Sequence, residues 1–257
     1  MLKQLLLGTA MLATSSFATY SYFPVPANHS GEAKIVGSYT MQDKWEDVGL
    51  ALKGRYVPIE NLELSLNIPF TLLTHWDGKD AKKDGVKNVA FGVRYQIIPI
   101  VAAFVDFEFP TGKKEVADDG FKFYLGGQYS ANFGVMGIGT ELGLSFTTEG
   151  KDKSQPPMQL TMAAELDPTL FASITPYIGA RINIILNDPQ YDGHDTAIET
   201  SGKTGFFPYV GANFKINQMF SFDLSATLGF GNDYLAYTCD GNNKTPVTFE
   251  ASFNASF

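Results

Sequence analysis

Residues 247–257 read V-T-F-E-A-S-F-N-A-S-F, and their pattern is the strongest indication of the fold. Apolar or small residues occupy every second position, and polar residues stand between them. Such strict alternation is typical of a β-strand with one apolar and one polar face, because successive side chains of a strand point to opposite sides. An edge strand of an ordinary sheet would show the same pattern, so the rest of the chain has to decide between the alternatives.

The final residue of this strand is the aromatic Phe257. A closing strand that ends on Phe resembles the C-terminal signature of bacterial outer-membrane β-barrels. The resemblance implies that the barrel-assembly machinery recognises this strand and guides the insertion of the protein. Outer-membrane lipid and lipopolysaccharide would then be its surroundings.

The other end of the chain has the pattern of a secretory signal peptide. A short basic start at residues 1–4 is followed by an apolar centre at residues 5–13 and a small-x-small cleavage pattern at residues 16–18. We therefore expect residues 1–18 to be removed on export. The apolar centre is too short to span a bilayer as an anchored helix.

The region after the signal peptide divides into two parts. Residues 19–32 show no clear period and contain Pro24 and Pro26, and we interpret them as a periplasmic lead-in. Residues 33–257 are interpreted as a single transmembrane β-barrel domain.

Alternating segments like the last one recur through that domain, each about 9–11 residues long, the length that a tilted membrane strand needs. The predicted strands lie near residues 35–41, 48–56, 62–72, 89–97, 101–109, 121–129, 136–146, 158–166, 174–184, 206–214, 220–230 and 247–257. Their number is even, and short connections follow the second, fourth, sixth, eighth and tenth strands. The pattern predicts an all-β fold, a closed antiparallel barrel of about twelve strands with short periplasmic turns and long extracellular loops, in the outer membrane of a Gram-negative bacterium.

Composition agrees with a membrane barrel. The chain has 21 Phe, 12 Tyr and 25 Gly, but charged residues make up only 18%. Beyond the signal peptide, no apolar run approaches the ~20 residues of a transmembrane helix. A net charge of -8 argues against a nucleic-acid partner. The single cysteine, Cys239, excludes an internal disulfide.

The polar face of the predicted strands carries charges of both signs, and Lys34 also lies on it. The candidate lumen-lining residues are Lys53, Arg55, Glu63, Arg94, Asp106, Glu108, Lys122, Glu141, Glu165, Arg181, Lys215, Asp223 and Glu250. Two interpretations remain open: a polar path for small solutes, or an electrostatic network that holds the cross-section of the barrel. A barrel of this size is wider than an eight-stranded barrel and narrower than an open porin.

Glycines are frequent on the same inward face, where they would leave space and favour a cavity. They are Gly92, Gly126, Gly137, Gly139, Gly143, Gly179 and Gly211.

Few residues point to catalysis, and we predict neither an enzyme nor a metal or cofactor site. Outer-membrane phospholipases need a His-Ser-Asn constellation on the barrel wall, and no predicted strand carries a His. The loop sequence at residues 192–195, D-G-H-D, would fit the Asp-His pair of outer-membrane proteases or, with Asp188, a loose Ca²⁺ site. A polar loop also produces such a cluster by chance. Loop lysines at residues 82–83 and 113–114 would suit lipopolysaccharide phosphates or simply be solvated.

One motif carries a family resemblance. Residues 107–113 read F-E-F-P-T-G-K, and residues 66–70 (L-N-I-P-F) and 88–95 (N-V-A-F-G-V-R-Y) fit the same layout. Together with the strand order, they resemble the outer-membrane family named for the meta-pathway of phenol degradation. The resemblance implies uptake of small, often hydrophobic or aromatic molecules, and it assigns no ligand residue. The sequence thus favours a narrow channel or transporter. The first alternative is a structural or surface-interaction barrel with a closed interior, and the second, less favoured alternative is an outer-membrane hydrolase.

Overall fold

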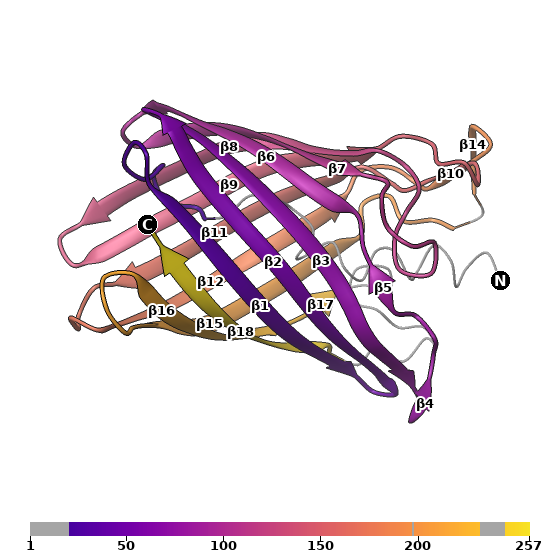
Figure 1. The fold of residues 1–257 in the computed structure, drawn as a ribbon. Helices are drawn as coiled ribbons and strands as arrows, with labels where there is room; N and C mark the ends of the chain where they lie inside the picture. Colours follow the sequence, from indigo (N-terminus) through magenta and orange to yellow (C-terminus); the bar gives the residue numbers. More distant parts are fainter. Residues whose placement is uncertain (1–20, 197, 232–244) are drawn as a thin grey trace.

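Twelve long antiparallel strands form one closed barrel in the computed structural model, which describes residues 21–196, 198–231 and 245–257 (Figure 1). Each long strand pairs with the long strands that precede and follow it in the sequence, and β1 pairs with β18 to close the wall. The long strands are β1 (Gly31–Gln42), β2 (Trp45–Ile59), β3 (Leu62–Trp76), β6 (Val89–Ile98), β7 (Val101–Phe109), β8 (Lys122–Phe133), β9 (Met136–Thr147), β11 (Gln159–Pro168), β12 (Ile174–Ile185), β15 (Thr204–Lys215), β16 (Phe220–Leu228) and β18 (Val247–Ser256). The predicted fold class is confirmed.

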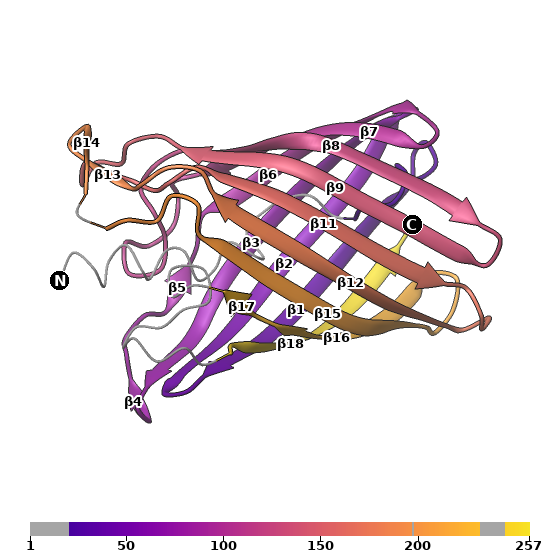
Figure 2. The same ribbon diagram turned by 180° about the vertical axis from the view of Figure 1, so that it is seen from behind.

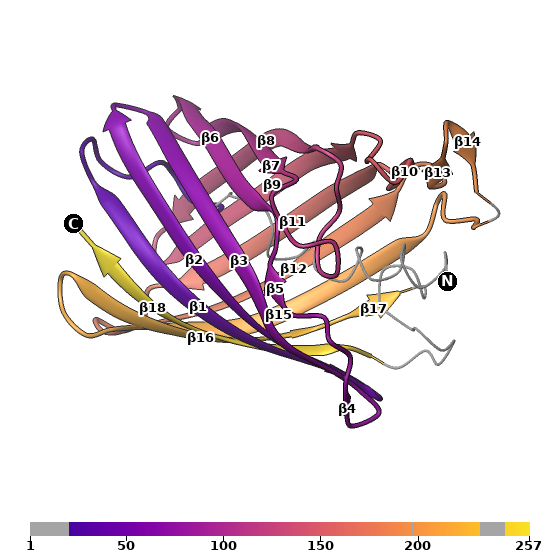
Figure 3. The same ribbon diagram turned by 45° about the vertical axis from the view of Figure 1, so that its right-hand side comes forward.

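Six short strands lie in the described parts of the connections. They are β4 (Lys79–Asp80), β5 (Gly85–Val86), β10 (Ser154–Gln155), β13 (Gln190–Tyr191), β14 (His194–Asp195) and β17 (Phe230–Gly231). β4 and β5 pair with β3, and β17 pairs with β15. β10, β13 and β14 form a small separate sheet that stands beyond one end of the barrel (Figure 3).

The two ends of the barrel differ in their connections (Figure 2). At one end, which we call the turn end, short connections at residues 60–61, 99–100, 134–135, 169–173 and 216–219 join the strands. Both Gly31 and Phe257 lie there, and the Gly31 N–H donates to the Phe257 carbonyl at 2.8 Å. The opposite end, the loop end, carries the long connections at residues 77–88, 110–121, 148–158 and 186–203.

One connection at the loop end departs from the expected alternation of lengths. β1 and β2 are joined by only Asp43 and Lys44, because both strands run further than the sequence pattern indicated. Asp43 has a φ of 48°, and Asn61 in the turn between β2 and β3 has a φ of 67°. Asp and Asn tolerate this left-handed conformation better than most residues, so they suit tight turns.

Side chains alternate between the two faces of the wall as predicted. On the outer face Ile35, Leu224 and Phe253 are 53%, 45% and 44% exposed, whereas Asn67 and Glu63 on the inner face are buried. A water-soluble protein buries its large apolar residues, so this inverted arrangement indicates an apolar environment around the barrel. None of the described residues forms a helix long and apolar enough to cross a membrane.

Three local predictions are wrong at strand ends. Residues 130–133, expected as a turn, belong to β8, and the turn is at Gly134 and Val135. The predicted strand at residues 220–230 is interrupted at Gly229, where an added Cβ would lie 2.6 Å from the Pro246 ring. β3 extends to Trp76 and therefore does carry a histidine, His75.

Hydrogen bonds of the P-T-G motif at residues 110–112 hold the loop that follows β7 in place. The Gly112 N–H donates to the Asn88 side-chain carbonyl at 3.0 Å, and the Val89 N–H donates to the Thr111 hydroxyl at 3.1 Å. A Cβ on Gly112 would lie 2.5 Å from the Ala117 Cβ, so only glycine fits this close approach. The motif thus has a structural reason that needs no ligand.

Candidate functional site in the barrel lumen

A cavity of about 570 Å³ lies inside the barrel. Its wall is polar and carries more acidic than basic side chains among the described residues. The acidic ones are Glu32, Asp47, Glu141, Glu165, Asp167, Asp223 and Glu250. The basic ones are Lys34, Lys53, Arg55, Lys87 and Arg181. The interior of this barrel therefore holds a charged chamber.

The thirteen candidate residues divide into three groups by their position. Those on the cavity wall are Lys53, Arg55, Glu141, Glu165, Arg181, Asp223 and Glu250. Those that are buried or half-buried on the inner face away from the cavity wall are Glu63, Arg94, Asp106, Glu108 and Lys122. Lys215 is exposed at the turn end of β15 and contributes nothing to the cavity wall.

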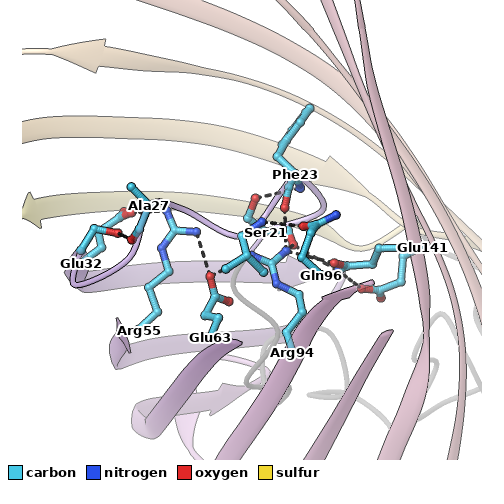
Figure 4. Close-up of polar contacts among 12 residues, drawn as sticks. Ser21, Phe23, Ala27, Glu32, Arg55, Glu63, Arg94, Gln96 and Glu141 are labelled. Carbon is cyan, nitrogen blue, oxygen red and sulfur yellow. Dashed lines mark hydrogen bonds and ion pairs between the residues drawn. The ribbon is translucent and has the colours of Figure 1, made fainter. Parts of the chain in front are cut away.

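The segment before β1, residues 21–30, lies against the inner face of the barrel (Figure 4). The Arg94 guanidinium donates from Nη1 to the backbone carbonyls of Ser21 and Phe23, both at 2.7 Å. The Gln128 side chain donates to the Ser21 carbonyl at 3.1 Å, and the Val25 N–H donates to the Gln96 side chain at 2.8 Å. Side chains of β6 and β8 thus bind backbone groups of this segment that would otherwise be hydrogen-bonded to a neighbouring strand.

This placement changes the interpretation of the lead-in. We expected residues 19–32 to precede the barrel in the periplasm, but the described part from Ser21 onward reaches into the lumen, and β1 already begins at Gly31. Ser21, Tyr22 and Phe23 line the cavity. Periodicity gives no warning of this, because the segment has no repeating face and its partners are side chains far away in the sequence.

Arg94 also belongs to a chain of ion pairs that continues through Glu63 to Arg55 (Figure 4). Arg94 Nη2 lies 2.8 Å from Glu63 Oε2, which also lies 3.4 Å from Arg55 Nη1. Arg55 Nη2 lies 2.5 Å from Glu32 Oε2. Arg94 and Glu63 are only 4% and 2% exposed, so losing either partner would leave an uncompensated buried charge.

Two tyrosines lie across one another on the part of the wall formed by β12 and β15. Tyr177 of β12 lies over Gly211 of β15, and Tyr209 of β15 lies over Gly179 of β12. Their rings meet edge to face with centroids 6.3 Å apart. An added Cβ on either glycine would collide with the ring above it.

Each of these tyrosines carries its hydroxyl across one strand to a carboxylate on the next. Tyr177 donates to Asp223 Oδ1 of β16 at 2.7 Å, and Tyr209 donates to Glu165 Oε2 of β11 at 2.7 Å. The two hydrogen bonds fix the orientation of two acidic side chains on the cavity wall.

A tyrosine also covers a glycine on the neighbouring wall, but its carboxylate partner belongs to the same strand as that glycine. Tyr124 of β8 lies over Gly143 of β9 and donates its hydroxyl to Glu141 Oε1. A Cβ on Gly139 would lie 2.8 Å from the Tyr22 Cβ. Gly143, Gly179 and Gly211 therefore lie under tyrosine rings, and Gly139 lies against the Cβ and backbone of Tyr22, so the expectation that these glycines leave open space is wrong.

Lys87 lies on the cavity wall in the connection between β5 and β6. It is 7% exposed, and burial lowers the pKa of its ammonium to about 8, although Asp47 and Glu108 favour the charged form. Desolvation outweighs the attraction of these carboxylates. Sequence reasoning missed Lys87 because it lies outside the alternating segments.

The loop residues considered for catalysis or metal binding have structural roles. Asp188 accepts hydrogen bonds from the Ser201 and Thr200 N–H groups, which hold the pKa of its carboxyl below the ordinary value. Asp192 pairs with Lys153 at 2.7 Å. No group of three or more metal-binding side chains occurs among the described residues. Cys239 and the predicted signal peptide lie outside the described ranges.

Comparison with known proteins places the fold. No family model and no curated protein matches the chain. Among solved structures, an outer membrane channel from Pseudomonas putida F1 has a TM-score of 0.72 at 12% identity, covering 93% of this chain and 99% of that chain. The translocator domain of the autotransporter NalP from Neisseria meningitidis has a TM-score of 0.61 at 12% identity, covering 91% and 90%. The NanC porin has a TM-score of 0.55 at 9% identity, covering 86% and 98%. The chain has the fold of bacterial outer-membrane barrels.

Proposed function

We propose that the protein is an outer-membrane channel that passes small solutes through its lumen. The observation that carries the proposal is the charged cavity of about 570 Å³ inside a closed wall with an apolar outer face. A wall that is apolar outside and polar inside suits a water-filled path through lipid. In this account lipid and lipopolysaccharide surround the barrel, and the barrel-assembly machinery recognises the strand that ends in Phe257.

The proposed solutes are small because the N-terminal segment takes up part of the lumen. The cavity wall also includes the aromatic side chains of Tyr22, Phe23, Tyr177, Phe207 and Tyr209. Aromatic rings beside charged groups suit solutes with an apolar or aromatic body and a polar handle. This agrees with the solute class that the family resemblance implies.

A closed structural barrel is the competing function, and a specific observation favours it. The contacts of Arg94 with Ser21 and Phe23 hold a segment of the chain inside the lumen. If that segment never moved, the ion pairs would only support the cross-section of the barrel.

Single-channel recording separates the two functions. Purified protein is added to a planar lipid bilayer in potassium chloride, and heat-unfolded protein serves as the control. A channel gives discrete current steps that the control lacks. A complete absence of steps at every voltage, from protein shown to be folded by its heat-modifiable electrophoretic mobility, would favour the structural barrel.

A further inference from the structure

Two lysines face each other inside the barrel. Lys34 of β1 and Lys53 of β2 are direct partners in the antiparallel register, and both lie on the cavity wall. Like charges directly opposite on neighbouring strands repel and destabilise a sheet. A neutral residue at either position would avoid that cost, so the pair calls for a physical explanation.

The next basic residue of β2, Arg55, has a different electrostatic environment. Arg55 lies two residues further along β2 and has carboxylate partners in Glu32 at 2.5 Å and Glu63 at 3.4 Å. Within the part of the chain that the structure describes, Lys53 has no ion pair within 4.0 Å. It interacts electrostatically at longer range with Lys34, with Glu250 on β18 and with Asp106 on β7. Its ammonium group therefore has donors to offer to a molecule in the cavity.

Carboxylates also lie on the cavity wall, on strands other than β1 and β2. Glu165 and Asp223 are held there by the hydroxyls of Tyr209 and Tyr177. Lys34 is close enough to Glu165 to interact with it electrostatically. A solute in the cavity would thus meet the ammonium groups of β1 and β2 and also oriented carboxylates with aromatic rings on β11, β12, β15 and β16.

We propose that the Lys34–Lys53 pair binds the carboxylate of a small monocarboxylic acid with an apolar body, which rests on the proposed channel function. A bound carboxylate accepts hydrogen bonds from both ammonium groups and cancels their repulsion. Acidic side chains outnumber basic ones on the wall, so the field of the cavity penalises a dianion more than a monoanion. The aromatic side chains of Tyr22 and Phe23 line the same cavity and contact the body of the solute.

Binding to the purified, detergent-solubilised protein tests the proposal directly. Isothermal titration calorimetry compares sodium benzoate with benzyl alcohol, which has a similar body but no charge, at constant ionic strength. Wild-type protein is expected to bind benzoate. Lys53→Gln and Lys34→Gln are each expected to weaken benzoate binding by about tenfold, the effect of losing one charge-assisted hydrogen bond of about 1.4 kcal/mol. The same variants should change the binding of benzyl alcohol less than twofold.

Two further variants exclude a merely structural effect. Lys53→Arg keeps a cation at the site and is expected to retain most of the affinity for benzoate. Lys215→Gln removes a lysine that is exposed at the turn end of β15, away from the cavity wall, and should leave benzoate affinity unchanged. Heat-modifiable electrophoretic mobility establishes that each variant is a folded barrel.

Three results would overturn the proposal: no benzoate binding to the wild type, equal benzoate affinities in wild type and both glutamine variants, or tighter binding of inorganic phosphate than of benzoate. The channel function is judged separately, by single-channel recording of the wild type and the variants in planar bilayers. Current steps that persist in all variants leave the channel intact, whatever the calorimetry shows for the carboxylate site. Absence of current steps from the folded wild type would reject the channel itself.

Discussion

At the scale of single residues, the pairing of glycine with tyrosine sets the shape of the acidic wall. Gly211→Ala would place a Cβ against the Tyr177 ring and 2.6 Å from the Leu224 carbonyl oxygen. Tyr177 would have to move and would lose its hydrogen bond to Asp223. Overpacking of this kind costs about 1–3 kcal/mol. We expect a loss of that size in the free energy of unfolding, measured by urea titration in lipid vesicles.

Gly37→Ala is the matched control for that substitution. Its Cβ would lie 3.9 Å from the Ala251 carbonyl oxygen, which is ordinary van der Waals distance. Equal stabilities of the two alanine variants would contradict the seating of Tyr177 over Gly211.

Lys87 provides a prediction about pH. Its pKa in the folded protein is about 8, below the ordinary value of 10.5, so the unfolded chain binds more protons between these two values. The burial cost is fully present below pH 8 and is relieved as the pH rises toward 10.5. The stability of the wild type relative to Lys87→Met should therefore rise across this window, by on the order of 3 kcal/mol.

Urea unfolding of both proteins in vesicles at several pH values measures that difference. Lys113→Met, which removes an exposed loop lysine, is the control and should show a flat difference from the wild type. A flat difference for Lys87→Met as well would mean that Lys87 is solvated in the folded protein.

At the scale of elements, the N-terminal segment behaves as a part of the lumen that is held by few bonds. Arg94→Gln would lose the Glu63 ion pair and weaken the hydrogen bonds to Ser21 and Phe23. We expect larger current steps or more frequent openings in planar bilayers, because the segment would leave the cavity more readily. Removal of residues 21–28 should produce the same change. Unaltered currents in both variants would show that the segment does not restrict the path.

The sequence predicts the long strands better than it predicts the N-terminal segment. Alternation located all twelve long strands, because lipid and water select opposite side chains at every second position of residues such as Phe249 and Glu250. Alternation does not give the register that lays Tyr177 over Gly211, since this pairing joins strands across an 18-residue connection. It also cannot place Ser21 and Phe23, whose backbone groups are bound by side chains instead of a neighbouring strand.

At the scale of the whole molecule, the proposed channel requires that solutes and ions move along the inner face of the barrel. Ser225 and Ala226 are consecutive residues of β16, and Ser225 lines the cavity while Ala226 follows the outward-facing Leu224 by two positions. A thiol at either position can be introduced by Ser225→Cys or Ala226→Cys after Cys239→Ser removes the native cysteine.

The most direct measurement is the single-channel current of these two variants before and after a bulky, charged, water-soluble thiol reagent is added. We expect smaller current steps after modification of Ser225→Cys and no change for Ala226→Cys. Currents that ignore modification at both positions, with labelling of Ser225→Cys established by mass spectrometry, would contradict this expectation.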